Sequence, residues 1–140
     1  MIKQTGFPGV DIDAIYKNTP RLAKKHLSSD EHDTCKSFWK AAQLFKWSSS
    51  LHRIVNEGKR SRFVIARLKG EGFRAGIWDY FLSYPTEKHH GLWIEFKSTK
   101  GRLTKEQQAF GLENSDHGYD TLVAKSAAEA IIYINDVYFK

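Results

Sequence analysis

The middle of the chain contains two apolar runs that are typical of β-strands. They cover residues 76–84 and 91–98, are rich in aromatic and β-branched residues, and each begins with glycine. Runs of this composition between turn-forming residues predict two strands. The polar segment from 85 to 91 is short enough to join them, so we expect an antiparallel hairpin. Shorter apolar runs predict further strands within residues 50–56 and 119–124.

Helical spacing of apolar residues predicts a helix before this hairpin. Ser28 and Glu31 have the spacing of a capping box, which satisfies backbone N–H groups at the start of a helix. The apolar residues that follow are predicted to form its buried face: Cys35, Phe38, Trp39, Ala42 and Phe45. Residues 11–25 have room for a short helix interrupted at Pro20. We therefore expect an N-terminal extension over residues 1–28, followed by a domain over residues 29–140.

Three later helices are predicted in the same way. One covers residues 59–69 and is expected to turn four apolar side chains inward: Phe63, Val64, Ala66 and Leu68. The next is opened by Thr104 and Gln107, which have capping-box spacing, and is ended by Gly118. The last follows Ser126 and Glu129, which repeat this spacing. Its apolar face comprises Ala127, Ala130, Ile131, Ile134 and Val137.

Composition narrows the class of protein. A chain of 140 residues predicts one main domain, and its net charge of +6 favours a polyanionic partner. The single cysteine, Cys35, excludes an intrachain disulfide and is consistent with a reducing compartment. No apolar run is long enough to cross a membrane, and the first residues lack the apolar core of a signal peptide. We expect a cytoplasmic protein, in a bacterium or a phage-infected host cell.

Charged residues lie where the two central strands should be apolar. Asp79 is near the start of the first strand, and Glu95 and Lys97 are near the end of the second. Side chains two residues apart in a strand point the same way, and an antiparallel hairpin brings Asp79 opposite that pair. Two clustered carboxylates repel each other unless a cation neutralises them. Oxygen ligands favour a hard ion, so the sequence predicts a Mg²⁺ or Mn²⁺ site here.

The order of these residues resembles the PD-(D/E)xK nucleases. Residues 76–79, the Glu95-Phe96-Lys97 triplet and the Gly-Arg-Leu-Thr-x-x-Gln run ending at Gln107 look like the virus-type replication–repair nuclease (VRR-NUC) family, and in particular like its small stand-alone phage members. The similarity runs from about residue 31 to 137. It implies a restriction-endonuclease-like α/β core, with a central mixed sheet flanked by helices. The family usually has proline where this chain has Trp78. Proline there shapes the backbone and binds nothing, so the site is expected to survive.

The resemblance implies roles for individual residues. Asp79, Glu95 and the backbone carbonyl of Phe96 are expected to hold one or two metal ions, and Lys97 to orient or activate the attacking water. In the family a glutamate on the first helix assists the metal, and Glu31 matches it, although Glu31 is equally suited to capping its own helix. Gln107 likewise has two interpretations: a helix cap, or a side chain beside the lysine that orients water or phosphate.

Basic residues gather just before the first of the two central strands. Seven lie between residues 53 and 74, against two acidic residues. A charge run is usually a solvated surface, but this one leads directly into the predicted site. Lysine and arginine neutralise phosphates and set position rather than sequence specificity. The predicted DNA contacts are Arg60, Arg62, Arg74, Lys100 and Arg102.

The resemblance to stand-alone phage members implies a homodimer that cuts branched DNA, Holliday junctions in particular, leaving a 3′-hydroxyl and a 5′-phosphate. Two alternatives stay open. One is a nuclease of the same chemistry that acts on nicked, flapped or duplex DNA. The other is a non-catalytic DNA-binding protein with a vestigial site, against which the complete set of Asp79, Glu95 and Lys97 argues.

Overall fold

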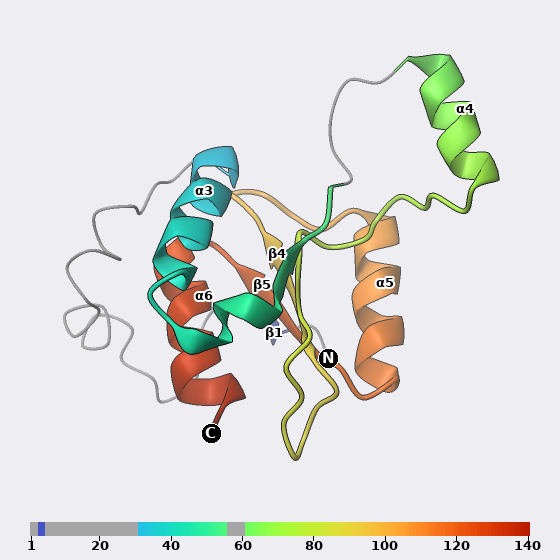
Figure 1. The fold of residues 1–140 in the computed structure, drawn as a ribbon. Helices are drawn as coiled ribbons and strands as arrows, with labels where there is room; N and C mark the ends of the chain where they lie inside the picture. The colour runs from blue at the N-terminus through green and yellow to red at the C-terminus, as the bar shows by residue number, and fades with distance from the viewer. Residues whose placement is uncertain (1–2, 5–30, 56–60) are drawn as a thin grey trace.

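A computed structural model describes residues 3–4, 31–55 and 61–140 of the protein. The helix expected within residues 11–25 and the cap expected at Ser28 lie outside the described residues. Those that are described form an α/β fold in three layers (Figure 1). Helices α3 (Glu31–Ala42) and α6 (Ala127–Tyr133) cover one face of a sheet, and α5 (Lys105–Asp116) covers the other. The predicted class, a mixed sheet flanked by helices, is confirmed.

The sheet is mixed because the chain enters it by both hairpin and crossover connections. Its strands, in chain order, are β1 (Lys3–Gln4), β2 (Leu51–Arg53), β3 (Tyr80–Leu82), β4 (Leu92–Phe96) and β5 (Asp120–Ala124). Their spatial order is β1-β5-β4-β3-β2. The pairs β1–β5 and β5–β4 are parallel, whereas β4–β3 and β3–β2 are antiparallel. The predicted hairpin is β3–β4, and α5 makes the crossover from β4 to its parallel neighbour β5.

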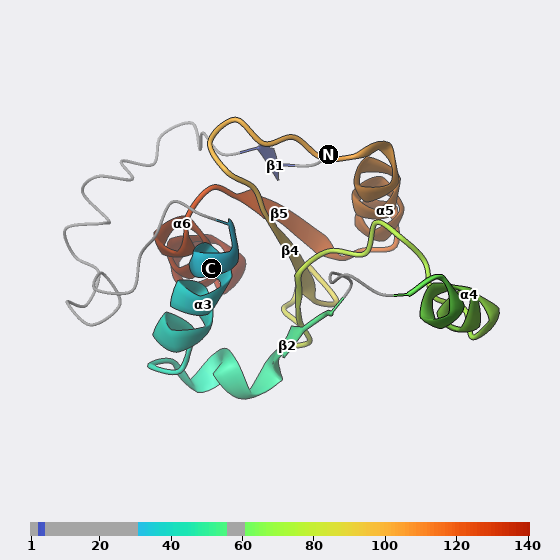
Figure 2. The same ribbon diagram turned by 90° about the horizontal axis from the view of Figure 1, so that it is seen from above.

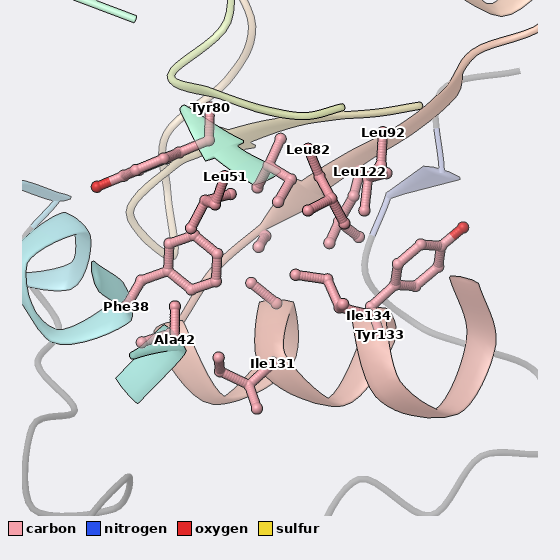
Figure 3. Packing of buried hydrophobic residues seen from close by; sticks show 14 of the residues in the cluster. Phe38, Ala42, Leu51, Tyr80, Leu82, Leu92, Leu122, Ile131, Tyr133 and Ile134 are labelled. Carbon is pink, nitrogen blue, oxygen red and sulfur yellow. The ribbon is translucent and has the colours of Figure 1, made fainter. Parts of the chain in front are cut away.

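The main core lies between the sheet and the pair α3–α6, which pack against each other (Figure 3). Phe38 is fully buried, and its ring meets that of Tyr80 edge-on with centroids 5.0 Å apart. From α6, Ile131 and Ile134 fill the space beneath the strands. Burial of one such side chain stabilises the fold by about 1.5–3 kcal/mol. This core therefore fixes the sheet on which the charged residues stand.

Two predictions about buried faces are wrong. Trp39 was expected on the inner face of α3, but it is 42% exposed, because the small residues Thr34, Ser37 and Ala41 pack against the core instead. Helix α4 (Arg62–Gly70) has no buried residue, and its Phe63 side chain is 89% exposed. The helix projects away from the sheet (Figures 1 and 2), so its apolar residues have no core to enter.

The predicted helix ends agree better with the structure. Thr104 and Gln107 form a complete capping box at the start of α5. Gly118 follows the end of α5 with a φ of +88°, a conformation that glycine adopts without strain. The hydroxyl of Ser126 accepts from the N–H of Glu129, but the Glu129 carboxylate turns back to the N–H of Lys125. Two short elements complete the fold: a 3₁₀ segment, η1 (Lys46–Ser50), precedes β2, and a π-helical turn, η2 (Ile134–Tyr138), follows α6. No helix among the described residues is long and apolar enough to span a membrane.

Candidate active site

The register of the β3–β4 hairpin brings the first two predicted site residues together. Tyr80 pairs with Ile94, so the residue before Tyr80 and the residue after Ile94 lie opposite each other. These are Asp79 and Glu95. The backbone N–H of Asp79 donates to Oε2 of Glu95 at 3.2 Å. The convergence predicted from strand alternation is therefore confirmed by a direct hydrogen bond.

The Asp79 carboxylate is held from two sides. Its Oδ2 accepts from the backbone N–H of Phe96 at 2.9 Å, which ties it to the end of β4. Its Oδ1 accepts from Nη1 of Arg53 at 3.0 Å. The same nitrogen also donates to the backbone carbonyls of Asp79 and Ile54. Asp79 is thus fixed in orientation by a neighbouring strand on each side.

Glu95 lies deeper than Asp79, with only 2% of its surface exposed. Its Oε1 accepts from Nζ of Lys97 at 2.8 Å and from Nε2 of Gln107 at 2.7 Å. Lys97 comes from just after β4 and Gln107 from the first turn of α5, on the opposite face of the sheet from α3. The carboxylate is therefore the point at which the hairpin and α5 meet.

Gln107 forms the predicted helix cap and also contacts Glu95, while its predicted role in orienting water or phosphate stays a prediction. Its Oε1 accepts from the backbone N–H of Thr104 at 3.0 Å, and the Thr104 hydroxyl accepts from the N–H of Gln107 at 3.2 Å. This reciprocal pair is the capping box. Because an amide side chain has a separate donor end, Nε2 remains available for Glu95. Gln107 thus links the start of α5 to the buried carboxylate.

Trp78, where the family usually has proline, anchors the same helix. Its side chain is fully buried, and its Nε1 donates to the backbone carbonyl of Gln107 at 2.9 Å. Gly76 lies close by with a φ of +90°, and a Cβ there would come within 2.7 Å of the Glu106 backbone. This segment therefore needs glycine and sets the distance between α5 and Glu95.

The charges in the site perturb one another. Burial, and then the charge of Asp79, raise the pKa of Glu95 to about 7, although Lys97 favours the ionised carboxylate. Burial alone lowers the pKa of Lys97, but its hydrogen bond to Glu95 and the charge of that group outweigh burial and raise it. Perturbed, partly buried groups of this kind are concentrated at functional sites. A second cation near the two carboxylates would relieve their repulsion.

The oxygen atoms of Asp79 and Glu95 fit the hard ion that the sequence predicts. Among the described residues, however, no three His, Cys, Asp or Glu side chains lie close enough together to hold a metal ion. Two carboxylates therefore need a further ligand, and the predicted one is the backbone carbonyl of Phe96, between Glu95 and Lys97.

Glu31 lies at the start of α3. Its Oε1 accepts from the backbone N–H of Ser98 at 2.9 Å, and its charge contributes to the raised pKa of Lys97. An added Cβ on Gly101 would lie 3.2 Å from that oxygen, so the 98–101 loop passes close over it. The structure thus places Glu31 beside the loop that follows Lys97. Its metal role stays a prediction.

Two basic residues belong to the site although the sequence did not assign them to it. Arg53 was counted only in the basic run, yet it contacts Asp79. Lys125 follows β5, and its Nζ donates to the backbone carbonyls of Ser98 and Gly101 at 3.0 and 2.8 Å. Only the strand order β5-β4-β3-β2 places these residues beside the hairpin. No motif or spacing in the chain signals either contact.

The predicted DNA contacts occupy different positions. Arg60 lies outside the described residues. Arg62 is on α4, Arg74 follows that helix, and Lys100 and Arg102 follow β4; all four side chains are exposed. Lys100 and Arg102 are within five residues of Lys97 along the chain, whereas Arg62 stands on the projecting helix.

Comparison with known proteins identifies the fold. No family model and no curated protein matches the chain. A solved structure described as a VRR_NUC domain protein is similar, with a TM-score of 0.63 and 23% sequence identity; the alignment covers 74% of this chain and 84% of that one. Similarity at this identity shows a shared fold. The chain therefore has the fold of a VRR-NUC domain protein, as the sequence motifs implied.

Proposed function

We propose that this protein is a metal-dependent nuclease of the PD-(D/E)xK type and a member of the VRR-NUC family, hydrolysing phosphodiester bonds in DNA. The observation that carries the proposal is the arrangement at Glu95. This carboxylate is buried, faces Asp79 across the hairpin and receives a lysine and a glutamine. Taking charges out of water costs several kcal/mol per ion, so structure alone rarely requires such a cluster. Its position at the end of two strands favours a catalytic role.

Mg²⁺ or Mn²⁺, held by Asp79, Glu95 and the carbonyl of Phe96, would supply Lewis-acid chemistry to the scissile phosphate and to water. The chain's own groups do the rest. Lys97 carries a compact charge that can orient the attacking water and stabilise negative charge on the phosphoryl oxygens. Gln107 keeps the Glu95 carboxylate in place while Lys97 turns towards substrate. The expected products have a 3′-hydroxyl and a 5′-phosphate.

The test of catalysis is Lys97→Ala, with cleavage of DNA measured in Mg²⁺ and in Mn²⁺. Removing a group that stabilises transition-state charge typically costs about 100- to 1,000-fold in rate, so cleavage should fall by at least that factor while DNA binding is retained. Lys40→Ala, an exposed lysine on α3, serves as the matched control and should cleave normally. Full activity of the Lys97 variant would refute the assignment. Absence of metal-dependent cleavage by the unaltered protein on every DNA tried would favour the DNA-binding alternative.

We further propose that the protein acts as a homodimer on branched DNA, Holliday junctions in particular. A two-fold dimer matches paired cuts across a junction. Helix α4 supports this part of the proposal. Its side chains Phe63, Val64 and Ile65 are exposed, and it also carries Arg62 and Arg67. A projecting helix with apolar and basic residues has the composition expected where a second copy and DNA meet.

Mass in solution and cleavage of a DNA panel test these two parts separately. The panel comprises a four-way junction, a flap, a nicked duplex and a linear duplex of the same sequence. Phe63→Ser should shift the mass from dimer to monomer, whereas Leu112→Ser, at an exposed apolar position on α5, should not. A monomeric unaltered protein would exclude the dimer. Equal rates on junction and linear duplex would exclude junction preference and favour the duplex alternative.

A further inference from the structure

A pocket lies beside the candidate active site, on the α3 side of the sheet. Its volume is about 330 Å³. One wall is the outward part of α3, and the other is formed by β2 and β3. The lining residues are His32, Cys35, Lys36, Trp39, Arg53 and Tyr80. The catalytic proposal assigns no substrate contact to any of them.

The pocket adjoins the Asp79 carboxylate through Arg53, which lines the pocket and binds Asp79. The Arg53 guanidinium lies over the Tyr80 ring, 5.1 Å from its centroid, and the same group binds Asp79 at 3.0 Å. Tyr80 is the next residue after Asp79, and its hydroxyl donates to the carbonyl of Cys35 on α3. The back of the pocket is therefore rigid, and it is separated from Asp79 by a single side chain.

The opposite side of the pocket carries an accessible aromatic ring and a cation. Trp39 was expected in the core, but it is 42% exposed on α3. Lys36, one turn earlier on the same helix, is also exposed. The exposed part of this large aromatic side chain gains no burial from the fold. An aromatic face beside cationic groups is the usual platform for an unpaired nucleobase, whose ring stacks while a cation meets its phosphate.

We propose that this pocket receives one unstacked nucleobase of the DNA strand that is cut, next to the scissile phosphate. The inference rests on the proposed nuclease function and specifies its substrate class. A volume of about 330 Å³ is at the small end of ligand pockets and has room for a single base. Trp39 is the stacking surface, Lys36 meets the adjoining phosphate, and Arg53 links the bound base to the orientation of Asp79.

The consequence is a preference for DNA that already has an unpaired base at the cut. Taking a base out of an intact duplex costs a few kcal/mol, whereas a branch point, flap or mismatch has lost part of that stacking. The pocket therefore favours branched and flapped substrates over continuous duplex without reading sequence.

Binding by the inactive Lys97→Ala protein tests the pocket without cleavage. The probe is a flapped DNA in which each nucleotide within three positions of the branch is replaced in turn by an abasic site. Trp39→Ala, made in the Lys97→Ala background, should weaken binding to the fully based DNA by about 5- to 150-fold, which corresponds to 1–3 kcal/mol of stacking. On the DNA that lacks the base bound in the pocket, the same substitution should change affinity less than two-fold. Trp39→Phe keeps an aromatic face and should restore most of the loss.

Two control variants separate base stacking from effects on folding and on overall charge. Leu112→Ala removes an exposed apolar side chain from another helix, and Lys40→Ala removes a lysine of α3 that does not line the pocket. The effect of either substitution on DNA affinity should be the same at every abasic position. Equal losses for Trp39→Ala at every abasic position, or no loss at any, would overturn the inference. The experiment measures binding, so its result tests the base pocket even if the unaltered protein does not cleave DNA. Failure of the nuclease proposal would instead appear as absence of metal-dependent cleavage across the whole panel.

Discussion

Helices α4 and α5 lead to and from the same hairpin, yet the fold uses them differently. Helix α5 is fixed to the site by Trp78, which binds the Gln107 backbone, and by Gln107 itself, which binds Glu95. Helix α4 has the more evident apolar residues in sequence, including Phe63, but none of its residues is buried. The difference shows that an apolar stripe predicts a helix but does not say what the helix packs against. Helix α5 is held by the Trp78 contact, the Gln107–Glu95 hydrogen bond and the packing of Phe110 on Trp78 and Trp93, and the surface left open on α4 is available for partners.

The largest difference between the two helices should appear in stability. Trp78→Ala removes a fully buried ring and the hydrogen bond to α5, so it should lower the free energy of unfolding by about 3–5 kcal/mol. Phe63→Ala on α4 removes an aromatic ring that is 89% exposed and should change the free energy of unfolding by less than about 0.5 kcal/mol. Urea denaturation followed by circular dichroism measures both. Similar losses for the two variants would mean that α4 packs on the body of the protein after all.

Comparing substitutions at Thr104 and Gln107 separates the contribution of the α5 helix cap from that of the contact to Glu95. Thr104→Ala removes only the cap and should cost about 1 kcal/mol of stability with little change in cleavage. Gln107→Ala removes the cap and the contact to Glu95, so cleavage should also fall, by about ten-fold or more. The measurements are urea denaturation and the single-turnover rate. If both variants lose equal activity, the contact to Glu95 has no role beyond holding the helix.

Glu95, which α5 contacts through Gln107, has a pKa near 7, so its affinity for a metal ion should depend on pH. A cation requires the ionised carboxylate, so affinity for Mn²⁺ should fall about ten-fold for each pH unit below 7. Without metal, the stability of the fold should depend on pH in the opposite direction. A carboxyl whose pKa is raised in the folded state favours folding below its ordinary pKa, and that contribution is lost as the pH rises through 7.

Calorimetric titration with Mn²⁺ at pH 6 and pH 8 checks this dependence. At pH 6, binding should release close to one proton, so the heat should vary with the ionisation enthalpy of the buffer. At pH 8 the heat should be nearly the same in every buffer. Proton release that is equal at both pH values would show that Glu95 does not titrate on metal binding.

The smallest effect is expected from the basic residues of α4. Arg62→Ala removes one exposed cation from the projecting helix and should weaken DNA binding evenly across sequences. If Arg62 contacts a phosphate, the slope of log affinity against log salt should become smaller by about 0.7–0.9. Arg67 is the matched comparison because it is already paired with Glu71 at 3.3 Å, so Arg67→Ala should change the slope less. Equal slopes for all three proteins would remove α4 from the DNA surface.

Much of the site was predictable because strand geometry is local. The period of a strand places Glu95 and Lys97 on one face, and a short hairpin brings Asp79 to them. The capping box at Thr104 was predictable for the same reason, since it depends on residues three apart. Arg53 and Lys125 were not predictable, because their contacts depend on which strands lie next to β3 and β4.

The sequence by itself determined four of the five strands described, most helix ends and the three charged side chains that meet at the hairpin; it did not predict β1. Those features depend on backbone periodicity and on short-range hydrogen bonds, which involve residues close together in the sequence. The tertiary structure alone decided that Trp39 faces water, that α4 projects, and that Gln107 joins its helix to Glu95. Each of these depends on which small residues let two elements approach and on where a buried carboxylate finds its donors. Such outcomes belong to the packed molecule and not to any single segment of the chain.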